Sequence, residues 1–96
     1  TIRPMEIAFD PDKSARNLLE RGLSFERVAE FDFESALFEE DRRRDYGELR
    51  IRSFGFLDGR LHALVFVTTQ VGIRVISLRR ANAREVRHYH EQTSEP

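Results

Sequence analysis

The sequence predicts a single small α+β domain: a short N-terminal strand and two helices, then an antiparallel β-meander and a C-terminal helix. Two runs rich in Val, Ile, Leu, Phe and Thr cover 61–69 and 73–79, and such residues suit the packed surface of a sheet. Only Thr69-Gln70-Val71-Gly72 links these runs, so we expect a turn and antiparallel pairing. A third run, 49–57, ends at Asp58-Gly59, which is a strong hairpin signal.

The run 61–69 is expected to be an interior strand of this meander. Its apolar residues fall on both faces of an extended chain, with Leu61, Ala63, Val65 and Val67 on one face and Leu64 and Phe66 on the other. Strands that are covered on both sides have this pattern, whereas edge strands with one wet face alternate.

The N-terminal part predicts a short strand over 6–9 followed by two helices. Asp10-Pro11 is a helix start, because Asp can cap and Pro suits the first helical position. Gly22 is expected to end this helix, and Ser24 to cap the second, with Leu23 packing on Val28. The residues expected to face inward are Ala15, Leu18, Leu19, Phe25, Val28 and Ala29.

Between these helices and the meander, 36–38 is a candidate for a short edge strand, and 39–44 is expected to be a loop. Asn82 and Glu85 form a capping-box pattern that starts the last helix. Its expected sheet-facing residues are Ala83, Val86 and Tyr89, and its expected solvent-facing residues are Arg84, Arg87 and His88. Residues 1–4 are expected to be an extension, 5–91 the folded domain and 92–96 a polar tail.

The composition fits one soluble domain. With 96 residues, 40% hydrophobic residues and eight Phe, the chain can build one core. It contains no Cys, which excludes disulfides and thiolate metal sites and fits a reducing cytoplasm. It has no apolar run of about 18 residues and no export signal, so we expect a cytoplasmic protein without a membrane contact.

Arginine is the residue type that points to a chemistry. Of 16 basic residues only Lys13 is lysine, and the planar guanidinium suits phosphate oxygens. No glycine-rich phosphate loop is evident. No metal motif is evident either, because His88 and His90 are two residues apart on a helix and their side chains diverge. Arg79 and Arg80 end the last strand and face opposite ways, so at most one serves a given cleft. They are either solvated or paired end-of-strand charges, or part of an RNA-binding rim.

A set of short motifs runs in order from Glu6 to Tyr89. They are Phe9-Asp10-Pro11 with Lys13 and Asn17, Gly22 with Phe25, Asp45–Arg50, Asp58–Arg60, and Arg74–Asn82 with Arg84, Glu85, Val86 and Tyr89. The most specific is the string ISLRRANAREVRHY at 76–89. Together they resemble the BrnT-type toxins of the bacterial BrnT/BrnA type II toxin–antitoxin systems. The chain departs from that pattern at Glu20-Arg21, where family members typically carry Lys-His.

The resemblance implies a RelE-like fold and a toxin ribonuclease that halts translation. It also implies a BrnA-like antitoxin partner. Operator DNA would be contacted by that antitoxin and not by the toxin itself. We expect the RNA cleavage to be metal-independent and to need no cofactor. The alternative is a non-catalytic interaction domain of the same fold that binds its antitoxin or another protein.

On the ribonuclease interpretation, Arg79 and Arg60 bind phosphate and the transition state, while Tyr89 and Glu85 are the available proton-transfer groups. Tyr89 equally suits the core and Glu85 a helix cap. The residues expected to steer the RNA backbone are Lys13, Arg21, Arg50, Arg80 and Arg84. An open basic pocket would favour the enzyme, whereas a cleft filled by side chains, or an Arg79 tied to carboxylates on all its donors, would favour the interaction domain.

Overall fold

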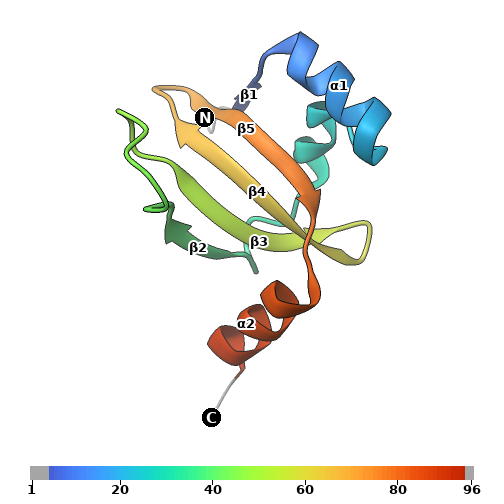
Figure 1. Ribbon diagram of the computed structural model, residues 1–96, viewed down its shortest axis with the longest axis vertical. Helices are drawn as coiled ribbons and strands as arrows, with labels where there is room; N and C mark the ends of the chain where they lie inside the picture. The colour runs from blue at the N-terminus through green and yellow to red at the C-terminus, as the bar shows by residue number, and fades with distance from the viewer. Residues whose placement is uncertain (1–4, 95–96) are drawn as a thin grey trace, which may run out of the picture.

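A five-stranded sheet in the order β1-β5-β4-β3-β2 organises the chain, whose computed structural model describes residues 5–94 (Figure 1). The strands are β1 (Glu6–Ala8), β2 (Leu37–Glu40), β3 (Ile51–Leu57), β4 (Arg60–Thr68) and β5 (Gly72–Arg80). The helical elements are α1 (Pro11–Arg21), the 3-10 helix η1 (Phe25–Glu30) and α2 (Ala83–Thr93). The predicted α+β class is confirmed, with α1 and η1 beside β5 and α2 beyond one end of that strand.

The meander is as predicted, because β3, β4 and β5 pair antiparallel in sequence order. Asp58 and Gly59 connect the first two strands with φ angles of 52° and 72°. Two consecutive positive φ angles are what a tight type I′ hairpin turn requires, and Asp and Gly tolerate them. This turn fixes the pairing of Arg60 with Leu57, and with it the register of β4.

The central strand β4 separates two cores, which confirms its predicted interior position. On one face, Leu64 and Phe66 pack in a cluster that receives Val28 from η1. On the other face, Leu61 and Ala63 pack in a smaller cluster that also contains Phe54 and Tyr89.

Both edges of the sheet carry short strands. β1 pairs parallel with β5, placing Ile7 beside Ile73, so the sheet is mixed rather than purely antiparallel. β2 pairs antiparallel with β3 and continues to Glu40, two residues into the segment predicted to be a loop. This extension places Glu39 beside Arg52 on β3.

The predicted inward face of α1 is wrong. Leu19 is 88% exposed, and Leu18 and Ala15 are exposed as well, whereas Ser14 is only 4% exposed. The reason is that α1 is held against η1 and β5 by polar contacts instead of an aliphatic stripe.

Two side chains of α1 make these contacts. The Ser14 hydroxyl accepts a 2.9 Å hydrogen bond from the backbone N–H of Phe25. The Asn17 amide donates to the backbone carbonyls of Leu23 at 2.8 Å and Leu78 at 3.0 Å. These bonds satisfy backbone groups at the start of η1 and within β5 that would otherwise be left unpaired.

The second predicted helix is a 3-10 helix, η1. Its residues Phe25 and Val28 are buried together with Phe31, which follows the helix. This spacing of three matches three residues per turn, so Ala29 points away from the core and is exposed. Ser24 occupies the predicted N-cap position of η1, but the predicted capping hydrogen bond is wrong, because the Ser24 side chain makes none.

The capping box of α2 is confirmed. The Asn82 side chain accepts from the Glu85 N–H, and the Glu85 carboxylate accepts from the Asn82 N–H, both at 2.9 Å. As predicted, Tyr89 is buried and Val86 is half-buried, but Ala83 is exposed and His88 is half-buried.

The helix α2 continues to Thr93, so the predicted tail begins later than Gln92. Residues 1–4 and 95–96, which include the predicted N-terminal extension, lie outside the described part of the chain. Between residues 5 and 94, no helix has the length and apolar character to span a bilayer.

Candidate functional site

Arg79 and Glu85 form a two-pronged ion pair between the end of β5 and the first turn of α2. Arg79 Nη1 and Nη2 donate to Glu85 Oε1 and Oε2 at 2.8 and 2.9 Å. The hydrogen bonds to Glu85 raise the pKa of Arg79, and those from Arg79 lower the pKa of Glu85. Both groups are therefore charged at neutral pH, and the guanidinium is fixed in one orientation.

Arg80 and Arg60 lie on the opposite face of the sheet from Arg79. Arg79 pairs with Ala63 in β4, whereas Arg80 pairs with the neighbouring His62. Arg60 is three residues from Ala63 along the same strand, which also puts it on the other face. Arg60 and Arg80 line a hollow of about 320 Å³ together with Arg21. The two predicted phosphate binders, Arg79 and Arg60, are thus separated by the sheet.

The Tyr89 side chain is part of the smaller core. Its ring is buried on the α2 side of the sheet and meets the ring of Phe56 edge-on, with centroids 5.5 Å apart. Its hydroxyl donates a 2.8 Å hydrogen bond to the backbone carbonyl of Ser35. This contact occupies the phenolic hydrogen.

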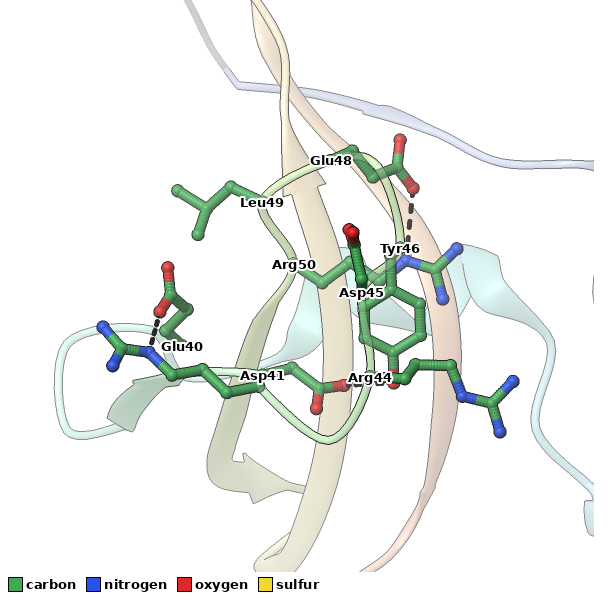
Figure 2. Close-up of a pocket in the computed structure, with 9 residues that line it drawn as sticks. Glu40, Asp41, Arg44, Asp45, Tyr46, Glu48, Leu49 and Arg50 are labelled. Atoms are coloured by element: carbon green, nitrogen blue, oxygen red, sulfur yellow. Dashed lines mark hydrogen bonds and ion pairs between the residues drawn. The ribbon is translucent and has the colours of Figure 1, made fainter.

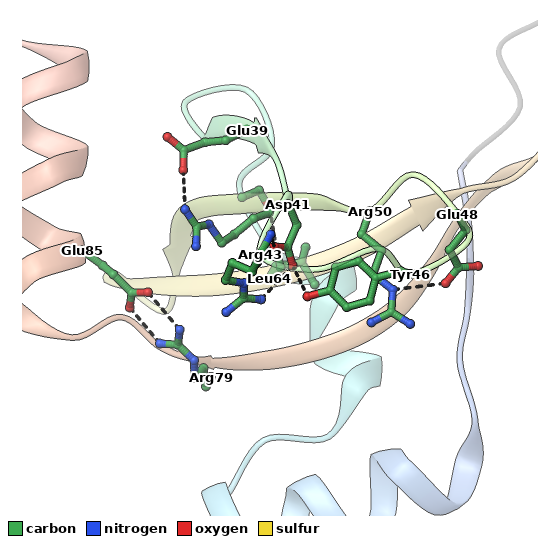
Figure 3. A network of polar contacts seen from close by, with 11 residues as sticks. Glu39, Asp41, Arg43, Tyr46, Glu48, Arg50, Leu64, Arg79 and Glu85 are labelled. Carbon is green, nitrogen blue, oxygen red and sulfur yellow. Dashed lines mark hydrogen bonds and ion pairs between the residues drawn. The ribbon is translucent and has the colours of Figure 1, made fainter.

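A loop from Asp41 to Arg50 folds over the same face of the sheet as Arg79 (Figure 3). The Asp41 side chain is 1% exposed and accepts hydrogen bonds from Arg43 Nε at 2.8 Å and Nη2 at 2.7 Å. Tyr46 donates to the same carboxylate at 3.3 Å. The Arg50 guanidinium stacks on the Tyr46 ring, 4.1 Å from its centroid. Asp41, Tyr46 and Arg50 are among the side chains that line an open hollow of about 570 Å³ (Figure 2).

A second cleft, of about 490 Å³, separates α2 from β2 and β3. Within it the Glu39 carboxylate accepts a 3.0 Å hydrogen bond from Arg52 Nη2 and lies 2.7 Å from His88 Nε2. The hydrogen bond with His88 is the main cause that lowers the pKa of Glu39. The other residues along the cleft are Phe54, Asn82, Arg84, Glu85, Arg87 and Glu91.

One comparison with known proteins identifies the family. The family model for the ribonuclease toxin BrnT of type II toxin–antitoxin systems matches residues 9–85, most of the 96-residue chain. The chain belongs to the BrnT ribonuclease toxin family. No curated protein matches it closely enough to count as a relative.

The match to the BrnT family agrees with the resemblance seen in the sequence, and it covers the residues that line both hollows and the β2, β3 and first-turn α2 residues of the cleft. It ends at Glu85, so the carboxylate of the Arg79–Glu85 pair is its last matched residue. His88 and Tyr89 on α2 lie beyond it.

The arginines of this BrnT-family chain divide between the two faces of the sheet. On the face beside α2, Figure 3 shows Arg43, Arg50 and Arg79 side by side with Tyr46, and Arg52 lies on the same side of β3. Of the predicted RNA-steering residues, Arg50 belongs to this face, and Arg84 is exposed on α2. The remaining three lie toward α1: Lys13 and Arg21 line a hollow beside β5 that Arg79 also lines, and Arg80 lines the other hollow with Arg21.

Sequence reasoning missed Glu39, Arg52 and His88. Glu39 was expected in a loop and His88 toward solvent, so nothing suggested that they meet. The available signal was the alternation of β3, because Arg52 is two residues before the buried Phe54 and therefore shares its face. Extending β2 by two residues would then have placed Glu39 beside Arg52.

Replacing Asp41 with asparagine should lower the free energy of unfolding at neutral pH by about 1–3 kcal/mol, because the bonds to Arg43 are charge-assisted. The hydrogen bonds from Arg43 lower the pKa of Asp41 far below its usual range. The native state therefore gains stability from the ionised carboxylate above the unfolded-state pKa of about 3.9 and loses that gain as the pH falls below it.

Urea unfolding at pH 7 and at several values below 4 tests this expectation for Asp41. The wild-type and Asp41→Asn stabilities should converge as the pH falls. A difference between them that stays the same at every pH would contradict the assigned role of the Asp41 charge.

Proposed function

We propose that this BrnT-family protein cleaves RNA without a metal ion and so inhibits translation in the cytoplasm. The observation that carries the proposal is the arginine-rich face of the sheet beside α2. Its four arginines, Arg43, Arg50, Arg52 and Arg79, come from the 41–50 loop and two strands. Guanidinium groups on one rigid surface can bind successive phosphates of a single strand.

The proposed reaction is attack of a ribose 2′-hydroxyl on the adjacent phosphorus. Negative charge then accumulates on the phosphate oxygens, and a preoriented cation lowers the barrier. We assign this role to Arg79, because Glu85 already fixes its guanidinium through two hydrogen bonds while the side chain remains 32% exposed. Arg60, with Lys13, Arg21, Arg80 and Arg84, is proposed to attract the RNA backbone from outside this face.

The metal-independent form of the proposal draws on how the carboxylates of this face are paired. The acids there are engaged with arginines, as Asp41 is with Arg43 and Glu85 with Arg79. Side chains of the protein would therefore supply both the charge stabilisation and the proton transfer.

The alternative is an interaction domain without catalysis, and the same ion pair favours it, since Glu85 occupies both Nη atoms of Arg79. Induced expression in bacteria separates the two. The ribonuclease should stop growth and methionine incorporation while cellular transcripts shorten, and Arg79→Ala should abolish all three effects. Growth arrest with intact transcripts would contradict RNA cleavage and favour the interaction domain.

We further propose a BrnA-like antitoxin that covers the arginine-rich face and contacts operator DNA on behalf of the complex. Acidic antitoxin groups would complement Arg43, Arg50 and Arg79, and such complementarity speeds and directs association. The co-expressed pair should elute together in size-exclusion chromatography at low salt. Separate elution of the two proteins would contradict this partnership.

A further inference from the structure

RNA cleavage of the proposed kind needs a group that accepts the 2′-hydroxyl proton. The two residues predicted for proton transfer are occupied in the structure. Glu85 accepts hydrogen bonds from Arg79 and from the Asn82 N–H, and its pKa is lowered, which makes it a weak base. Tyr89 is buried, with its hydroxyl bonded to Ser35. The proton acceptor must therefore be sought elsewhere on this face.

His88 has the geometry of such a group. Its Nε2 lies 2.7 Å from a Glu39 carboxylate oxygen. An ionised carboxylate can only accept, so Nε2 carries the hydrogen and the lone pair of the neutral ring is on Nδ1. Nδ1 makes no hydrogen bond to any residue between 5 and 94, and the side chain is 39% exposed. The lone pair of Nδ1 is thus available in the cleft between α2 and strands β2 and β3.

The partner of His88 is itself held in place. Glu39 pairs with Arg52 across β2 and β3, and Arg52 Nη2 donates to its second oxygen at 3.0 Å. Contacts with His88 and Arg52 lower the pKa of Glu39, so its carboxylate stays ionised at neutral pH. The His88 ring also meets Phe54 edge-on, with centroids 6.2 Å apart. A carboxylate and an aromatic ring together fix the tautomer and the plane of the imidazole.

Cations line the same cleft. Arg84 and Arg87 reach it from α2, and Arg52 forms part of its floor. Arg52 Nε is buried and has no acceptor within residues 5–94, so only the Nη groups of this partly exposed side chain can face the cleft. Glu85, the partner of Arg79, lines the cleft as well. A phosphate drawn to these cations would lie in the same cleft as the His88 ring.

We propose that His88, positioned by Glu39, is the proton acceptor for RNA cleavage in this cleft; the assignment rests on the proposed ribonuclease function. The 2′-oxygen forms a bond to phosphorus while its proton passes to His88 Nδ1. The bond from phosphorus to the 5′-oxygen breaks, and this oxygen takes a proton from water. The imidazolium then returns its proton to the resulting hydroxide. The products are a 2′,3′-cyclic phosphate and a 5′-hydroxyl end.

The test compares His88→Gln with His90→Gln in the purified full chain, acting on a labelled single-stranded RNA and on messenger RNA in programmed ribosomes. His90 is the matched control, because it is exposed on the same helix but points about 200° away. His88→Gln should lower kcat on the order of a hundredfold or more with KM little changed. His90→Gln should stay within about threefold of wild type, since only one well-placed base is needed.

Two further readouts separate catalysis from a structural role. The wild-type rate should rise with pH and level off, and His88→Gln should lose this dependence. The charged groups that line the cleft with His88 are Glu39 on β2, Arg52 on β3, and Arg84, Glu85, Arg87 and Glu91 on α2. Glu39→Gln should lower kcat with KM retained, because a neutral amide no longer stabilises the protonated ring.

The outcomes distinguish the inference from the function on which it rests. If the wild-type chain cleaves RNA and His88→Gln keeps its rate and pH dependence, the His88 assignment is wrong while the ribonuclease function stands. If His90→Gln loses as much activity as His88→Gln, the effect belongs to the helix and the assignment is also wrong. If the wild-type chain leaves both RNAs intact, the proposed function fails and the assignment with it.

Discussion

Replacing Leu64 with aspartate should abolish the cooperative fold. Leu64 is 0% exposed in the middle of β4 and packs in the core beneath η1. An unpaired carboxylate at that position costs several kcal/mol, which is comparable to the total stability of a small domain, roughly 5–15 kcal/mol. Near-UV circular dichroism and a thermal scan should show no native signal and no cooperative transition.

The neighbouring residue provides a matched control. Val65 is also buried in β4, but it faces the α2 side and lies opposite Arg52 in the pairing with β3. An aspartate at 65 would have this guanidinium as a partner, so Val65→Asp should be destabilised yet still folded. A Leu64→Asp protein that melts cooperatively near the wild-type temperature would contradict the placement of β4.

Replacing Arg79 with lysine should reduce RNA cleavage nearly as much as replacing it with alanine, by on the order of a hundredfold or more. Lysine keeps the charge but cannot make the two-pronged contact with Glu85 that orients the guanidinium. Because the Arg79 side chain is partly exposed, the loss of the ion pair should change the melting temperature only modestly.

Arg84 is the control residue that shows how much activity is lost when a positive charge is changed outside the proposed active site. It is exposed on α2, and none of its contacts among the described residues is an ion pair. Arg84→Lys should therefore keep activity within a few-fold of wild type, and Arg84→Ala should weaken it mainly at higher salt. Rates of RNA decay for all four variants test this contrast. Wild-type activity in Arg79→Lys would make Arg79 a counter-charge for Glu85 and place the active site elsewhere.

Local signals in the sequence were sufficient where local chemistry decides the structure. Asp58-Gly59 determined the hairpin, and the spacing of Asn82 and Glu85 determined the start of α2. The inward face of α1 could not be predicted this way. Ser14 and Asn17 hold this helix in place by hydrogen bonds to backbone groups of η1 and β5. Hydrophobic periodicity does not reveal such bonds.

The candidate site was less predictable than the fold for a related reason. Arg79 and Glu85 are six residues apart, and the chain brings them together through the capping box of α2. His88 and Glu39 are 49 residues apart, and they meet only because α2 lies against the edge of the sheet formed by β2. Their contact follows from the docking of a helix, which single-sequence patterns do not encode.

The most direct test of the account is RNA cleavage by the purified chain in the presence of excess chelator, with the ends of the products identified. If arginines and a side-chain base carry out the reaction, cleavage should persist with the chelator, and the products should end in 2′,3′-cyclic phosphate and 5′-hydroxyl groups. A single 2′-deoxy substitution at the cleaved position should block it. Cleavage that stops with the chelator, continues through the 2′-deoxy position and leaves 5′-phosphate ends would contradict the account.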